Sequence, residues 1–129
     1  MQTTFVPAGA TRESLETPGA VRGNCLQAAV ASLFELSLSE VPHFVAEDDW
    51  WGCLTDWLDV RGLTPVYVPH SDVIPWGVPY LAIGDSPRGD YSHVVIEVEN
   101  ELVHDPHPDG TGLRDFRKGI YLFVPKSYA

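Results

Sequence analysis

Beyond Gly62 the sequence breaks into five short runs rich in Val, Ile, Leu and Tyr, and this feature restricts the fold more than any other. Gly, Pro, Asp and Asn separate the runs, as expected where strands end in turns. The predicted strands are LTPVYVP, PYLAIG, SHVVIEVE, ELVHDP and KGIYLFVP. Because loops of this length join neighbouring strands that run in opposite directions, the sequence predicts a mostly antiparallel sheet.

The residues before Gly62 show helical spacing instead. Apolar residues recur every three or four positions over residues 25–36, and again in the tryptophan-rich stretch 48–61. Asn24 is suited to cap the first helix, and Gly62 to the left-handed conformation beyond the second. Between them, SLSEVPHF predicts a short capped turn that ends at Pro42. Helices followed by strands predict an α+β fold, with the first helix across one face of the sheet.

The length and charge of the chain narrow its class. With 129 residues, 44% of them hydrophobic, it can build one core but not two, so we predict a single domain over residues 1–129. Eighteen acidic and eight basic residues give a net charge of −10, and the acidic residues are dispersed. Because this surface repels phosphate backbones, nucleic acid is not expected as a partner.

The sequence gives no sign of export or membrane insertion. It lacks the basic start and apolar block of a secretory signal, and no apolar run approaches the roughly 20 residues that span a bilayer. Cys25 and Cys53 are too few for a disulfide framework, and a reducing compartment keeps them as thiols. We therefore expect a cytoplasmic protein with no membrane partner.

Cys25 stands at the first position of the first predicted helix, where it is either a small core residue or a nucleophile. A thiol attacks only as the thiolate, a minor form at neutral pH when the pKa has its ordinary value of about 8.5. The unpaired amides and the dipole at a helix start favour negative charge, and a nearby imidazolium would add to this effect. Cys53 lies within the tryptophan-rich helix, where core packing explains it.

His93 is the best-placed partner for such a thiol, because it opens a strand at one end of the predicted sheet. The next strand ends in Asp105, whose carboxylate could orient an imidazole. A three-residue loop at residues 99–101 would pair Val95 with Asp105 and place Asp105 and His93 on one face, roughly 7 to 8 Å apart at Cα. A two-residue loop would pair Val94 with Asp105 and put the two on opposite faces. A catalytic interpretation therefore requires the first register.

This arrangement resembles that of papain-like cysteine hydrolases, which combine a cysteine opening a helix, a histidine starting a strand and an acidic or amide residue ending the next. The compact layout is similar to that of bacteriocin-leader-processing peptidases. More closely, GNCLQAAVASLFELSLSEVPHF and YLAIGDSPRGDYSHVVIEVENELVHDPHPDGTGL resemble small papain-like proteins of uncharacterised role from bacteriophages and bacteria. The likeness covers about two-thirds of the chain. It implies a papain-like fold, with N-terminal helices packed on a mostly antiparallel sheet.

The resemblance also implies a role for each residue. Cys25 would be the nucleophile, His93 the general base and acid, and Asp105 the residue that fixes the imidazole tautomer. An oxyanion hole would combine the backbone amide of the nucleophile with a glutamine side chain several residues upstream. The sequence departs from the pattern here, because the only upstream glutamine is the distant Gln2. Asn24 competes with Gln2 for this role.

Two further groups have alternative interpretations. Trp50 and Trp51 are adjacent in the second predicted helix and cannot both face the core equally, so one is expected at the rim of a cleft. The segment HDPHPDG contains histidines and aspartates that could bind zinc. No Cys pair or helical His-Glu motif accompanies it, so no metal and no other cofactor is expected. His104 and His107 are expected as loop residues, with His104 directed away from His93.

The sequence leaves two functions open. The first is a cysteine-dependent hydrolase that cleaves an amide, isopeptide or thioester bond of a protein or peptide substrate through a Cys-His-Asp triad. The second is a catalytically silent papain-like binding or inhibitor protein, of the kind encoded by phages, that acts on a host protein. The alkylation rates of the two cysteines separate them, because only an activated Cys25 reacts much faster than Cys53 near neutral pH.

Overall fold

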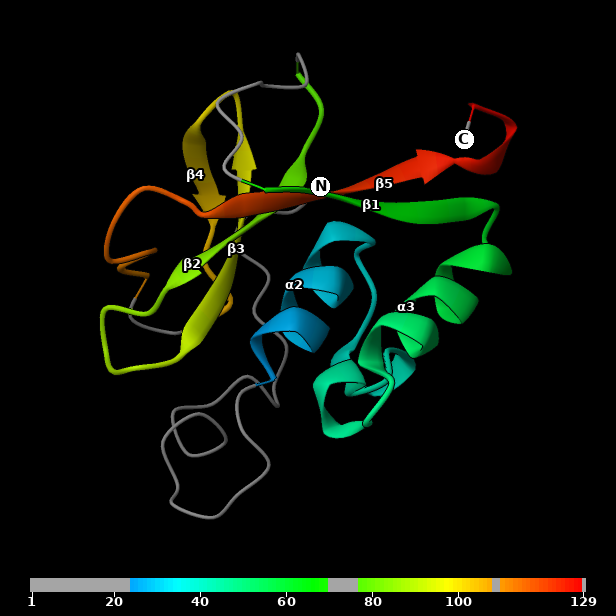
Figure 1. Ribbon diagram of the computed structural model, residues 1–129, viewed down its shortest axis with the longest axis horizontal. Coiled ribbons are helices and arrows are strands. Elements are labelled where there is room, and N and C mark those ends of the chain that lie inside the picture. Colours follow the sequence, from blue (N-terminus) through cyan, green and yellow to red (C-terminus); the bar gives the residue numbers. More distant parts are fainter. Residues whose placement is uncertain (1–23, 70–76, 108–109, 129) are drawn as a thin grey trace.

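The computed structural model describes residues 24–69, 77–107 and 110–128, and these residues form the predicted α+β arrangement, in which helices pack on an antiparallel sheet (Figure 1). The α-helices are α2 (Cys25–Leu33) and α3 (Trp50–Asp59). Short 3-10 helices are η1 (Leu38–Glu40), η2 (Phe44–Ala46) and η3 (Lys126–Tyr128). The strands are β1 (Leu63–Pro69), β2 (Tyr80–Asp85), β3 (Ser92–Val98), β4 (Glu101–His104) and β5 (Gly119–Pro125).

The five strands form one sheet in the order β1-β5-β2-β3-β4, with every neighbouring pair antiparallel. The last strand of the chain, β5, therefore lies between the first two. Both helices lie on the same side of the sheet, α2 against β3 and α3 against β1 (Figure 1). None of the helices in the described part of the chain is long and apolar enough to cross a membrane.

The main core lies between the helices and the sheet. Alternate residues of β2 and β3, such as Leu81, Val94 and Ile96, face α2, whose apolar stripe packs on them. A side chain of this size contributes roughly 1.5 to 3 kcal/mol when it is fully buried. The opposite face of the sheet carries a smaller apolar cluster. Its buried members are Tyr80, Ala82, Val95 and Ile120.

The start of α2 at Cys25 confirms the prediction, but Asn24 does not act as predicted. It occupies the N-cap position without a side-chain capping hydrogen bond. The first turn is instead tied to η1 and to the residue after it through Gln27, whose amide donates to the carbonyl oxygens of Leu38 at 3.3 Å and Val41 at 2.7 Å. Helix α3 begins at Trp50, later than predicted, because the Asp49 carboxylate caps it by accepting from the amide of Gly52 at 3.1 Å. Its start is therefore set by a cap and not by the apolar spacing.

The β3–β4 hairpin has the shorter of the two turns that the sequence left open. Val98 pairs with Glu101, so the turn consists of two residues. These residues, Glu99 and Asn100, have positive φ angles of 50° and 69°. Two successive residues in this conformation form a type I′ turn, whose twist matches that of antiparallel strands. The structure thus has the two-residue turn and not the three-residue loop that the catalytic interpretation called for.

A β-bulge nevertheless produces the register that the catalytic interpretation requires. The pairing shifts by one residue after the first two pairs, so that Ile96 pairs with His104 and Val103 is the extra residue of the bulge. The shift reverses the direction of every side chain that follows. Asp105 therefore falls on the same face as His93, as predicted, although by a different route.

Candidate active site

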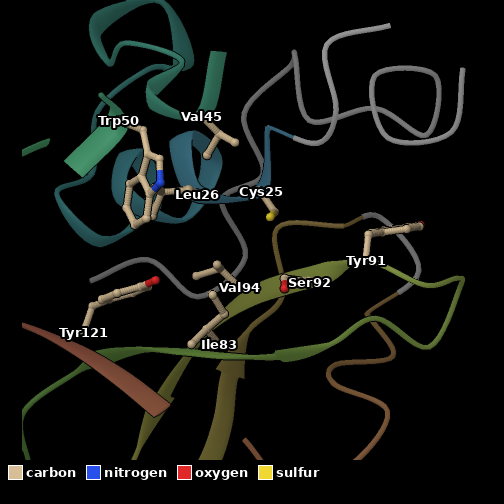
Figure 2. A pocket seen from close by; sticks show the side chains of 9 residues that line it. All are labelled: Cys25, Leu26, Val45, Trp50, Ile83, Tyr91, Ser92, Val94 and Tyr121. Atoms are coloured by element: carbon tan, nitrogen blue, oxygen red, sulfur yellow. The ribbon is translucent and has the colours of Figure 1, made fainter. Parts of the chain in front are cut away.

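The start of α2 points into a cleft between the helices and the sheet, and Cys25 lies at this point (Figure 2). Its side chain is half-buried and is not in a disulfide. The first amides of a helix have no partner within the helix and carry the positive end of its dipole. The thiol therefore sits where the backbone favours a negative charge, yet it remains accessible from the cleft.

His93 is the second residue of β3, and its ring is completely buried. Nε2 lies 2.7 Å from Oδ1 of Asp105. Because an ionised carboxylate can only accept, Nε2 carries the proton and donates it in this hydrogen bond. In a neutral imidazole this leaves Nδ1 without a proton. Asp105 therefore selects the tautomer in which Nδ1 can act as a base.

The other neighbour of the imidazole is Cys25. Burial lowers the pKa of His93, but the hydrogen bond with Asp105, the hydrogen bond with Cys25 and the negative charges of both groups outweigh it and raise this pKa to about 9. Nδ1 makes no hydrogen bond of regular geometry within the described residues. The thiol thus acts on the ring from close by, but in a loose geometry. Nucleophile and base are often this loosely paired before a substrate binds.

Asp105 is held rigidly by the backbone. Oδ1 accepts from the amide of His107 at 2.9 Å, and Oδ2 accepts from the amide of Gly112 at 2.7 Å. Burial raises the pKa of this carboxyl group. The hydrogen bond with His93, the charge of His93 and the two backbone amides lower the pKa by more, so that it lies below its ordinary value. The carboxylate is therefore charged and fixed in direction, as an orienting group must be.

The three side chains approach from two layers of the molecule. Cys25 comes from the helical layer, whereas His93 and Asp105 share the sheet face on which Val95 packs. They meet because His93 stands near the start of β3, at one end of the sheet. This end of the sheet thus brings Cys25, which is distant in the sequence, together with two residues of the β3–β4 hairpin, His93 and Asp105.

A cavity of about 380 Å³ extends from the thiol between the two layers (Figure 2). Its walls are mainly apolar, and its volume lies within the range of small-ligand sites. The helical layer contributes one wall and the strands β2, β3 and β5 contribute the other. The lining residues are Cys25, Leu26, Val45, Trp50, Ile83, Tyr91, Ser92, Val94 and Tyr121.

Trp50 and Trp51 take different positions, as their adjacency predicted. Trp50 lines the cavity, whereas Trp51 is 36% exposed outside it. Both rings contact Tyr121, with centroids 6.3 and 5.9 Å from its ring. Burial, with the neighbouring Tyr67 and Cys25, raises the pKa of Tyr121 to about 12, so this wall of the cavity is an uncharged phenol.

The oxyanion-hole candidates have unequal support. Gln2 lies outside the described residues. Asn24 is buried beside the thiol, and its side chain makes no capping hydrogen bond. The backbone amides of the first turn of α2 supply further donors at the same point.

The structure corrects the expected position of His104 and agrees with that of His107. His104 is the last residue of β4 and not a loop residue, whereas His107 lies in the loop that follows; both are buried. His104 faces α2, where its Nε2 lies 3.2 Å from Oγ of Ser32. Within the described residues no group of three or more His, Cys, Asp or Glu side chains could hold a metal ion, although part of the HDPHPDG segment lies outside them.

Several residues of this region escaped the sequence analysis. Tyr121 and Val45 line the cavity from elements whose apolar residues all look alike in a single sequence. In the sequence, Ser32 only interrupts the apolar stripe of the helix, and Gly112 resembles any other loop glycine, so neither shows its role. The partly buried Cys53 packs against the main core, consistent with the structural role expected for it.

Comparisons of the chain with protein-family models, with curated proteins and with solved structures found no match. The functional argument therefore rests on the geometry of the site.

Proposed function

We propose that this protein is a papain-like cysteine hydrolase that acts on a protein or peptide substrate. One observation carries the proposal: the imidazole of His93 is bonded to Asp105 through Nε2, and Cys25 is among the groups that raise the pKa of this ring. A nucleophile, a base and a group that orients the base form the minimal apparatus of covalent acyl transfer. A cysteine that served only to fill the core would need neither partner.

In the proposed reaction, the proton of the Cys25 thiol resides on Nδ1 of His93, whose raised pKa favours the imidazolium, and the Cys25 thiolate attacks the carbonyl carbon of the substrate. The first-turn amides of α2 donate to the oxyanion that forms, with the Asn24 side chain as a further candidate. The imidazolium then returns its proton to the leaving amine or thiol, and an acyl group remains on Sγ. Water, deprotonated by the same imidazole, hydrolyses this thioester and regenerates the free thiol.

The cavity beside Cys25 supports a substrate with a large apolar group near the scissile carbonyl. Its walls carry aliphatic and aromatic side chains such as Leu26, Trp50 and Val94. An apolar group that leaves water for such a cavity gains roughly 25 cal/mol per Å² of buried surface. Cleavage of an amide, an isopeptide or a thioester bond uses the same catalytic residues. We therefore propose the class of cysteine hydrolases and do not choose among these three bonds.

Alkylation of the two cysteines tests the proposal. Iodoacetamide at pH 6 to 7, followed by mass spectrometry of the peptides, should label Cys25 at least about tenfold faster than Cys53. Cys53 is a built-in control, since burial and the carboxylates of Glu47, Asp49 and Asp56 raise its pKa. The preference should disappear in the His93→Gln variant. Equal rates in the unmodified protein would contradict an activated thiol.

A catalytically silent papain-like binding protein is the second candidate. Trp51 and Tyr67 are 36% and 42% exposed, and the acidic residues 47–49 are exposed close to Trp51 in the chain. Such a surface suits a partner with basic and apolar residues. The Cys25→Ala variant separates the candidates, because it should abolish hydrolysis under the first and leave partner binding intact under the second.

A further inference from the structure

We infer that the buried hydrogen bond between Ser32 and His104 keeps the β-bulge in register and thereby places Asp105 against His93. Ser32 and His104 are therefore positioning residues. Their effect on the placement of Asp105 is independent of the proposed function, but its importance for catalysis rests on that proposal.

The bond links the helix of the nucleophile to the strand that leads to Asp105. Ser32 lies two turns after Cys25 in α2, so both residues are on the same face of the helix. Its Oγ lies 3.2 Å from Nε2 of His104. The two residues are 0% and 5% exposed, so water does not compete for the bond. One face of α2 thus contacts the site at its start and the bulge near its end.

The bulge itself faces α2. Val103 packs against the main core, and His104 bonds Ser32, so both residues of the bulge point toward the helix. Two consecutive side chains on one face is the geometry of a bulged strand, because the extra residue interrupts the alternation. The next residue, Asp105, consequently points to the opposite face, where it meets His93.

An unbulged hairpin is the competing register of the same sequence. With the same two-residue turn, Ile96 would pair with Val103, and the alternation would turn His104 away from α2 and Asp105 toward it. The Ser32–His104 bond would be lost in this register, together with the bond between His93 and Asp105. Because the bulged register contains this buried hydrogen bond and the unbulged register lacks it, the Ser32–His104 bond favours the bulged form.

The test compares two substitutions of His104 and follows the imidazole of His93 by NMR titration. His104→Leu keeps the apolar volume but cannot bond Ser32, whereas the amide of His104→Gln can reach the position of Nε2. Loss of a nearby carboxylate typically lowers an imidazole pKa by about 1 unit or more. We therefore expect the pKa of His93 to fall from about 9 toward its ordinary value in His104→Leu, and to stay near 9 in His104→Gln.

Ser32→Ala provides a second variant, which removes a single oxygen atom and decides the question if His104→Leu does not fold. It should lower the pKa of His93 as His104→Leu does, and the double variant should add little to either one. An unchanged His93 titration in folded Ser32→Ala or His104→Leu protein would overturn the inference. Slow alkylation of Cys25 in the unmodified protein would instead refute the hydrolase and leave this comparison intact.

Discussion

On the face covered by the helices, the sheet is held by apolar contacts, whereas on the opposite face a small apolar cluster is surrounded by directed polar contacts. Leu54, Leu58 and Leu81 are completely buried on the first face. On the second, Asp105 bonds His93, and Arg117 bonds both Glu97 and Asn100. Apolar burial scales with area and tolerates small shifts, but a hydrogen bond requires a defined distance and angle. Apart from the Ser32–His104 bond, the helix face therefore supplies stability and the other face supplies precision.

The largest loss of stability is expected from Arg117→Leu. The Arg117 side chain is 1% exposed and bonds Glu97 at 3.1 Å, and Tyr80 donates to the same carboxylate oxygen. Removing one partner of a buried ion pair typically costs about 3 to 5 kcal/mol, since the other charge stays buried. Urea unfolding should show this loss. The double variant Arg117→Leu/Glu97→Gln should recover part of it, and no recovery would mean that the pair itself contributes little.

Leu81→Ala should cost about 2 to 5 kcal/mol on the helix face, because it opens a cavity in the main core. Unlike loss of the Ser32–His104 or His93–Asp105 hydrogen bond, it should leave the His93 titration of the folded protein unchanged. Urea unfolding and NMR measure the two effects. Val60→Ala is the control, since Val60 is 79% exposed and its substitution should alter stability by less than about 0.5 kcal/mol. A shifted His93 titration in Leu81→Ala would break the comparison between the faces.

The pH dependence of stability should report the His93–Asp105 pair. The pKa of His93 is raised from 6.5 to about 9, so its stabilising contribution is complete below pH 6.5 and is lost as the pH rises through about 9. Stability should therefore decline between these values. Asp105→Asn should flatten the decline, because it removes the carboxylate that stabilises the imidazolium. Urea midpoints measured across this range for both proteins test the expectation, and parallel curves would contradict it.

The smallest effect is expected from Lys126→Ala. Lys126 of η3 forms an ion pair with Asp59 at the end of α3, and both side chains are about half exposed. Exposed pairs of this kind contribute about 0 to 1 kcal/mol and weaken as salt is added. Thermal unfolding of the variant and the unmodified protein, at low and at high salt, should show a difference in stability no larger than this. A greater loss of stability would mean that the Lys126–Asp59 ion pair, which belongs to neither face of the sheet, has a structural role of its own.

Much of the fold was predictable because it depends on local patterns. The five strands follow from runs of β-branched and aromatic residues between turn residues, and the start of α2 follows from its apolar spacing. Gly62 has the predicted positive φ, at 75°, beyond α3. The boundary of α3 at Trp50 was missed because a cap formed by Asp49 overrode the periodicity.

The site was only partly predictable for a related reason. His93 and Asp105 could be nominated from their positions at strand ends, and the structure places them 2.7 Å apart. Their shared face, however, depends on Val103, and nothing local in the sequence distinguishes a bulge there from a longer turn. The cavity beside Cys25 was not predictable, since the strand and helix residues that line it are apolar like those of the core.

The sequence by itself determined the elements, their order and the kinds of side chain at their ends, because these depend on backbone preferences and on apolar residues separated by a few positions. Only the tertiary structure decided the hairpin register, the tautomer of His93 and the shape of the cavity. The physical reason is that each of these depends on contacts between distant segments, such as Ser32 with His104, whose free energies differ between registers that have the same local pattern.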